Sequence, residues 1–175
     1  MTSALAAIGR ACTAQARVPT PLGPLLLVRT RAGLAGAWFE GQRHHPPAYE
    51  APLRPDDALL AQAAAQLDRY FEGDGATFDV ALDLVGSDFQ RAVWRALLAI
   101  PRGRTCTYAD IARRVGAPAA VRAVGAAVGR NPLSILVPCH RVLGSDGTLT
   151  GYAGGLDRKA ALLRLEGVEA AAALH

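Results

Sequence analysis

Lysine is almost absent from this 175-residue chain, since Lys159 is the only one among 19 basic residues and the others are arginine. The formal net charge is +4 at pH 7, a modest excess that also occurs in proteins with no acidic partner. Arginine suits contacts with phosphate and stacking on bases, but charge alone gives weak support for a nucleic acid ligand. No apolar stretch approaches the roughly 18 to 20 residues that span a bilayer, so no membrane-spanning helix is expected.

Acidic residues are missing from positions 1–39, a bias that faintly resembles an organelle transit peptide. The alanine-rich, lysine-poor composition runs through the whole chain, so we interpret it as compositional drift and expect a cytoplasmic protein.

Cysteine is scarce as well. The three cysteines form an odd set whose spacing predicts neither a disulfide framework nor a CxxC metal site. Cys12 lies in an N-terminal segment, residues 1–17, that we expect to be mobile, and Cys106 is expected to be half-buried. His44 and His45 lie in a loop without matching ligands, so no metal site is predicted.

The first part of the chain predicts a small antiparallel sheet. Residues 25–30 and 33–39 are apolar runs typical of strands, and residues 78–84 alternate apolar and polar side chains like a third strand. Apolar residues between them recur at helical spacing over residues 60–71 and predict one helix that covers the sheet. Its capping residues are Asp56 or Asp57 at the start and Gly73 at the end.

The pattern changes near residue 85, after which the chain reads as mainly helical. Ser87 begins a capping-box motif and a helix that ends before Pro101. Four apolar residues of that helix are expected to be buried, namely Phe89, Val93, Trp94 and Leu97. The change of pattern predicts two domains, residues 1–84 and 85–175.

A helix-turn-helix pattern follows. Thr107 can cap a helix over residues 108–115, Gly116 can end it, and Pro118 fits the first position of a second helix. The second helix is expected to bury Val121, Val124 and Val128. Its opposite face carries small residues interrupted by arginine, namely Ala119, Arg122, Ala123, Ala126 and Arg130. Such a face could enter a DNA groove without reading bases, although most helix pairs of this kind bind no DNA.

The tetrapeptide 138–141, with the sequence PCHR, carries the strongest chemical signal. A thiol held behind a proline and beside an imidazole can be ionised near neutral pH, and the thiolate is a strong nucleophile. Asp146 and Gly147 form a tight-turn signal, which predicts a short hairpin of residues 142–144 and 148–150.

Taken together, these motifs resemble the O6-alkylguanine-DNA alkyltransferases. The active-site signature of that family is matched by residues 138–142, with an Asn-Pro pair before them and the glycine-rich loop 151–155 after them. Residues 20–25, 89–94, 107–108 and 158–166 are similar to further family segments in the same order, so the resemblance covers about residues 18–168. It implies an α+β fold, in which a ribonuclease H-like N-terminal sheet with its helix packs on a helical C-terminal domain.

The resemblance also implies a function: repair of double-stranded DNA by irreversible transfer of the alkyl group of O6-methylguanine, with O4-methylthymine as a second candidate substrate, to Cys139. In the family, the base is flipped out of the stack, each molecule repairs one lesion, and no cofactor is used. We expect a monomer. His140 takes the thiol proton through a water, Glu166 orients His140, and Asn131 holds the turn before the cysteine.

Other residues are assigned to the DNA and the base by the same resemblance. Tyr108 assists extrusion of the base and contacts it, and Arg122 fills the vacated space with Ala123 beside it. Ser145 touches DNA from its turn. The guanine pocket is lined by Val142, Tyr152, Ala153 and Gly154.

Plainer interpretations stay open for several of these residues. Glu166 could fray into solvent at a helix end, although it shares the apolar face of Leu162 and Leu163. Asn131 could simply end a helix, Arg122 could be a solvated charge, and Ser145 could be an ordinary turn residue.

Two other classes of protein compete with the alkyltransferase. A Cys-His-Glu hydrolase or acyl transferase would use the same nucleophile, but with turnover. A non-catalytic alkyltransferase-like protein would lack the cysteine. The chain departs from the family pattern at Arg104, often glutamate, and at Ala153, serine in some relatives. It also lacks a zinc-binding set near Cys12.

Overall fold

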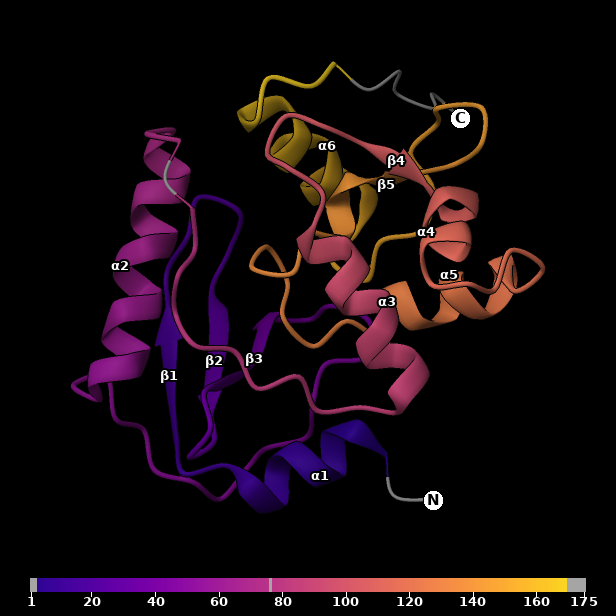
Figure 1. Ribbon diagram of the computed structural model, residues 1–175. Helices are drawn as coiled ribbons and strands as arrows, with labels where there is room; N and C mark the ends of the chain where they lie inside the picture. Colours follow the sequence, from indigo (N-terminus) through magenta and orange to yellow (C-terminus); the bar gives the residue numbers. More distant parts are fainter. Residues whose placement is uncertain (1–2, 76, 170–175) are drawn as a thin grey trace. The chain divides into compact units, whose positions relative to one another are not determined.

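The computed structural model describes residues 3–75 and 77–169, which form two compact units. The first unit contains residues up to 86 together with residues 132–134, and the second contains residues 87–131 and the chain from 135 onward. Figure 1 traces the elements of each unit in chain order.

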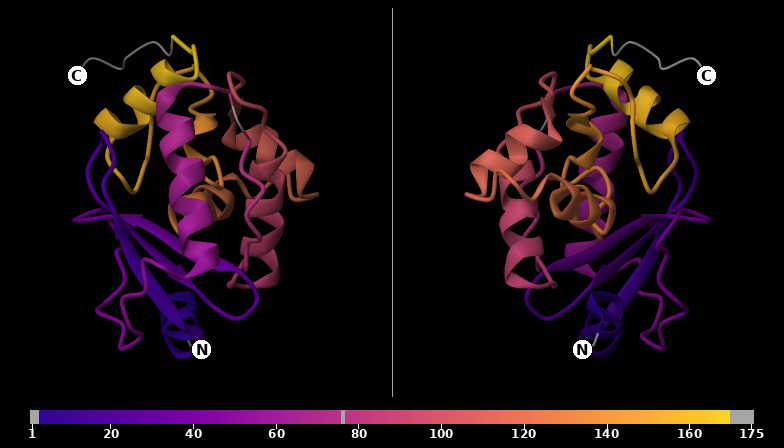
Figure 2. Two further views of the ribbon diagram at one scale, coloured as in Figure 1. Left: turned by 90° about the vertical axis from the view of Figure 1, so that its left-hand side faces the viewer. Right: turned by 90° about the vertical axis from the view of Figure 1, so that its right-hand side faces the viewer.

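The first unit is built on an antiparallel sheet of order β1-β2-β3. The strands are β1 (Ala14–Val18), β2 (Leu25–Arg29) and β3 (Leu34–Phe39). The predictions for β2 and β3 are confirmed, and the register between them shifts at Val28 and Arg29. The helix α2 (Ala58–Glu72) contacts all three strands, as Figure 2 lets the reader follow, so the predicted covering helix is also confirmed.

The expectation of a mobile N-terminus is wrong for the described residues 3–17. Ser3 caps the helix α1 (Ala4–Ala11), and β1 follows it. Ile8 of α1 is fully buried in a cluster with Leu26, Val28 and Trp38. The strand was missed because alanine, which is depleted in strands, fills much of it. Backbone pairing along the whole of β2 stabilises it instead.

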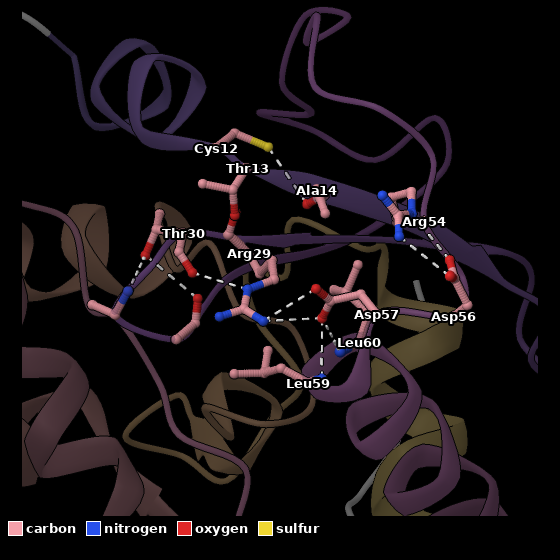
Figure 3. Close-up of polar contacts among 12 residues, drawn as sticks. Cys12, Thr13, Ala14, Arg29, Thr30, Arg54, Asp56, Asp57, Leu59 and Leu60 are labelled. Carbon is pink, nitrogen blue, oxygen red and sulfur yellow. Dashed lines mark hydrogen bonds and ion pairs between the residues drawn. The ribbon is translucent and has the colours of Figure 1, made fainter.

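Local caps and one ion pair fix the start of α2, as Figure 3 shows. The Asp57 carboxylate accepts hydrogen bonds from the backbone amides of Leu59 and Leu60, which makes it the N-cap. The same carboxylate pairs with the Arg29 guanidinium of β2 at 3.1 Å. Gly73 adopts a left-handed conformation (φ 77°) at the other end. The helix is therefore tied to the sheet at its first turn.

The predicted third strand at residues 78–84 is absent from the structure. This segment makes one isolated parallel bridge, between Leu34 and Leu82. The amide of Leu34 donates to the Ala81 carbonyl, and the amide of Asp83 donates to the Leu34 carbonyl, both at 2.8 Å. Alternating side chains suit any extended segment with one buried side, so the pattern did not distinguish a strand from a bridged segment.

The second unit is mainly helical, as predicted. It contains α3 (Asp88–Leu98), β4 (Cys106–Thr107), α4 (Tyr108–Arg114), α5 (Val121–Gly129), the 3-10 helix η1 (Cys139–Arg141), β5 (Val142–Leu143) and α6 (Leu156–Leu165). The capping box predicted at Ser87 is present, and Thr107 caps α4 as predicted, in a capping box with Asp110. Phe89 is only half-buried, whereas the other three residues predicted inside α3 are buried.

The hairpin predicted around Asp146 and Gly147 is not formed. The turn itself exists, with the Gly144 amide donating to the Thr148 carbonyl at 3.0 Å, but β5 pairs with β4, in parallel. Cys106 lies in this short ladder and is buried rather than half-buried.

Among the residues described, no helix is long and apolar enough to cross a membrane.

Candidate active site

Cys139 lies at the start of η1, beneath the surface of the second unit, with only 6% of its area exposed. The apolar run 135–137 leads into it, and all three of those residues are buried. The Cys139 amide donates to the Val137 carbonyl at 2.8 Å. Ile135 has φ 73°, a left-handed conformation that costs a β-branched residue about 1–3 kcal/mol. The approach to the cysteine is thus a fixed and locally strained turn.

Asn131 connects that turn to the thiol. Its side-chain amide donates to the Val137 carbonyl at 2.9 Å and to the Cys139 Sγ at 3.1 Å. Asn131 is itself buried. A donor aimed at sulfur favours the thiolate over the thiol, so Asn131 does more than end α5.

The expectation of a thiol ionised near neutral pH is wrong for the resting site. Burial raises the pKa of Cys139 above its usual value of 9.0, and the Asn131 hydrogen bond and the charge of Lys159 only oppose that effect. The sequence placed an imidazole beside the thiol but could not show how completely both groups are enclosed. The thiol is therefore protonated until reaction.

His140 is fully buried and faces a carboxylate. Its Nε2 lies 2.8 Å from Oε1 of Glu166, whose side chain has no exposed area. Against an ionised carboxylate Nε2 carries the proton, which leaves Nδ1 as the basic nitrogen. Nδ1 is buried and has no hydrogen-bond partner within the described chain. The interpretation of Glu166 as a frayed, solvated residue is wrong.

The protonation state of His140 is set by opposing effects. Burial lowers the pKa of His140 from its usual 6.5, and the charges of Arg141 and Lys159 act in the same direction. Only the hydrogen bond and the charge of Glu166 raise it. At pH 7 the imidazole is consequently neutral and able to accept a proton.

Arg141 holds the same carboxylate. The Arg141 guanidinium donates from Nε to Oε2 of Glu166 at 2.8 Å and from Nη2 to Oε1 at 2.9 Å. Its Nη1 donates to the Ile100 carbonyl at 2.6 Å, and the Gly103 amide lies 3.5 Å from Oε2. This bidentate arrangement orients Glu166 toward His140.

The segment after β5 is tied to the site by a buried lysine. Lys159 has no exposed area. Its ammonium donates to the carbonyls of Val142 at 2.5 Å, Thr150 at 2.8 Å and Gly151 at 3.5 Å. Burial lowers the pKa of Lys159 to about 8. The Tyr108 hydroxyl donates to two of the same carbonyls, Thr150 at 3.1 Å and Gly151 at 3.3 Å. Lys159 and Tyr108 therefore hold the start of the loop together.

The structure places the predicted pocket residues around this frame. Val142 is fully buried in β5, and Gly154 is buried at the start of the turn before α6. Tyr152 and Ala153 are half-buried. The carbonyl of Gly154 accepts from Arg158 at 3.0 Å.

The predicted DNA-facing residues lie on the outside of the helix pair. Arg122, Ala123, Ala126 and Arg130 are all exposed, and α5 is anchored from behind by the Trp94 indole, which donates to the Ala127 carbonyl at 2.9 Å. Ser145 is exposed in its turn. Two details were wrong. Pro118 and Ala119 lie in a turn before α5, and Val121 is 37% exposed because α5 begins only there.

Lys159 and Arg141 are the site residues that the sequence reasoning missed. Lys159 carried a signal, since a single lysine in an arginine-rich chain marks a position that arginine does not satisfy. Arg141 carried none beyond its place in the PCHR tetrapeptide, because its partner lies 25 positions away. No group of three or more metal-ligating side chains occurs in residues 3–75 and 77–169.

Comparisons with known proteins give a consistent result over both units. Residues 88–168 match the family described as 6-O-methylguanine DNA methyltransferase, DNA binding domain, and residues 16–84 match its ribonuclease-like domain. A methylated-DNA–protein-cysteine methyltransferase from Mycobacterium tuberculosis is 48% identical over 149 residues, covering 85% of this chain and 89% of the relative. One from Methanosarcina barkeri is 47% identical, with 85% and 94% covered.

Solved structures agree in fold. The crystal structure of Mycobacterium tuberculosis OGT in complex with DNA superposes with a TM-score of 0.76 at 46% identity, covering 88% of this chain and 92% of that one. The ribonuclease-like domain and the DNA-binding domain therefore follow each other in this chain as they do there.

Proposed function

The chain belongs to the 6-O-methylguanine DNA methyltransferase family, and from that premise we propose that it repairs DNA by moving the alkyl group of O6-alkylguanine onto Cys139. It is a methylated-DNA–[protein]-cysteine S-methyltransferase. The observation that carries the assignment of residues is the burial of Cys139 next to a buried pair of the His140 imidazole and the Glu166 carboxylate. We place the DNA-binding and active-site domain at residues 85–175 and the N-terminal domain at residues 1–84.

The chemistry begins with a neutral thiol and a neutral imidazole. Nδ1 of His140 takes the thiol proton through a water molecule, and Glu166 stabilises the imidazolium that forms. The Asn131 amide, 3.1 Å from Sγ, stabilises the developing thiolate. Sγ attacks the alkyl carbon, the carbon–O6 bond breaks, and its electron pair stays on guanine. Guanine takes up one proton and the imidazolium gives one up to solvent, so that the net change is thiol and alkylguanine to thioether and guanine.

Access to the lesion requires base flipping, because a stacked base cannot reach a buried thiol. We assign entry into the duplex to the exposed face of α5, with Arg122 filling the vacated space and Ala123 allowing close approach. Tyr108 touches the flipped nucleotide from the start of α4, and Ser145 adds a contact from its turn. Val142, Tyr152, Ala153 and Gly154 enclose the guanine, and Lys159 keeps the neighbouring carbonyls in place.

A thioether does not hydrolyse in water, so each molecule repairs one lesion. The leaving guanine supplies the driving force, and the reaction draws on no cofactor.

One protomer contributes every assigned residue, which supports action as a monomer. The three cysteines are free thiols, which fits the reducing cytoplasm. O4-methylthymine presents a similar alkyl ether and is a second substrate of the same site.

Comparison of the three cysteines tests the assignment. The wild type and the Cys139→Ser, Cys106→Ser and Cys12→Ser variants are each incubated with an excess of a duplex containing one O6-methylguanine, and the loss of modified base is followed by chromatography. We expect repair by all of them except Cys139→Ser. Repair by Cys139→Ser would refute the assignment, and repair of many lesions per molecule would favour a hydrolytic enzyme.

A further inference from the structure

One carboxylate in the site has two hydrogen-bonding partners at once, an arginine and a histidine. Both oxygens of Glu166 are engaged by Arg141, at 2.8 and 2.9 Å, and one of them also receives His140 at 2.8 Å. The side chains of His140 and Glu166 have no exposed area, and that of Arg141 is 12% exposed. A guanidinium stays charged at any pH that a protein meets. The three groups therefore form a buried unit whose net charge depends only on His140 near neutral pH.

Arg141 changes the net charge of this buried unit. With a neutral imidazole, the Arg141 cation and the Glu166 anion cancel. With an imidazolium, the same unit carries one uncompensated positive charge away from water, which is costly. Without Arg141 the balance would reverse, because Glu166 alone would be neutralised by a protonated His140.

The other charged groups near His140 either add positive charge, which also disfavours an imidazolium, or lie away from His140. Lys159 of α6 is fully buried and positive, and Cys139 is a protonated thiol in the resting state. The loop after α3 supplies a further cation, Arg102, which donates to the Leu165 carbonyl at 3.3 Å. The charged residues of α3 itself are not buried, namely Asp88, Arg91 and Arg95. Glu166 is thus the one negative partner that the described contacts give His140.

We propose that Arg141 is a positioning residue for alkyl transfer, whose guanidinium fixes both oxygens of Glu166 and keeps His140 neutral until the thiol proton arrives. Its third contact, to the Ile100 carbonyl at 2.6 Å, helps to fix the guanidinium beside the carboxylate. An imidazolium in the resting site would have no lone pair at Nδ1 and could accept nothing from Cys139. Because of Arg141, His140 stays neutral and able to accept the thiol proton at lower pH. The inference rests on the proposed function, because it concerns the same proton transfer.

Arg141→Met tests this role, since methionine keeps much of the stem and removes the charge. The single-turnover rate of transfer from free O6-benzylguanine to Cys139 is measured from about pH 5 to about pH 8.5, where imidazole titrates. Free O6-benzylguanine is used because it excludes any effect of the substitution on DNA binding. We expect the midpoint of the acid limb to move up by about one pH unit or more, which slows the reaction about tenfold on that limb. Arg141→Lys keeps the positive charge but loses the bidentate hydrogen bonds to Glu166. It should lower the maximal rate and leave the midpoint of the acid limb in place. Arg95→Met, an exposed arginine of α3, should change neither.

A uniform loss of rate at every pH in Arg141→Met, with the midpoint unmoved, would overturn the proposal and leave Arg141 a structural residue. The ring-proton NMR titration of His140, in Cys139→Ser protein with and without Arg141→Gln, reads the same shift without any alkyl transfer. It also serves if Arg141→Met does not fold. An upward shift of the His140 midpoint supports the proposal and no shift refutes it, whereas failure of the wild type to accept an alkyl group refutes only the proposed function.

Discussion

Replacing Glu166 by glutamine removes one buried negative charge and leaves the shape of the side chain unchanged. Glu166 accepts from His140 and from Arg141, and in the proposed reaction His140 becomes an imidazolium during transfer. Unit charges about 4 Å apart attract by about 4 kcal/mol at an effective dielectric constant of about 20. The glutamine keeps a neutral hydrogen bond of about 1 kcal/mol. The variant should therefore lose about 3 kcal/mol of transition-state stabilisation, a rate lower by about 100-fold.

A rapid-quench assay under single-turnover conditions measures this loss. A duplex with one O6-methylguanine is mixed with excess protein, and methyl transfer to the protein is followed in time. The pH is held at 7.5, about one unit above the usual pKa of histidine. Glu169→Gln is the matched control, because Glu169 is exposed beyond α6, and it should react like the wild type. Urea unfolding checks that the Glu166→Gln protein is folded. A folded Glu166→Gln protein that reacts within about twofold of the wild type would refute the role of the carboxylate.

Three further predictions follow from the same site. The acid limb of the wild-type rate profile should have its midpoint below 6.5, the usual pKa of histidine, because burial lowers the pKa of His140 and the neutral imidazole is the proposed base. A midpoint above 6.5 in a stopped-flow pH profile would contradict this. Lys159→Met should lower the free energy of unfolding by about 2 kcal/mol, because the carbonyls of Val142 and Thr150 lose their donor, and an unchanged urea midpoint would count against it. Arg122→Ala should slow repair of duplex lesions more than reaction with free O6-benzylguanine, and equal losses would exclude Arg122 from the duplex.

Helix boundaries could be predicted from the sequence because the signals that set them are local. Asp57 and Gly73 delimit α2, and Ser87 and Thr107 cap their helices through hydrogen bonds within three positions along the chain. A cap needs no partner from elsewhere in the fold. Where the signal was weaker, at Pro118, the predicted start of α5 was three residues too early.

The strands were less predictable because their partners are distant in the sequence. The alanine-rich β1 exists through pairing with β2, whereas residues 78–84 have a good alternating pattern and only one bridge. The same limit applies to the active site. The motif placed Cys139 beside His140, but burial, which raises the thiol pKa, depends on every element around η1. The pairing of Arg141 with Glu166 depends on where α6 ends, and no local pattern encodes that.

We propose above all that Cys139 is a consumable acceptor for one alkyl group. Intact-protein mass spectrometry after incubation with excess duplex containing O6-methylguanine tests it most directly, followed by peptide mapping to locate the change. We predict that every active molecule gains one CH2 unit, that the gain is on Cys139, and that the loss of lesions stops at one per protein molecule. Unmodified protein after many lesions have disappeared, or a methyl group on Cys12 or Cys106, would contradict the account.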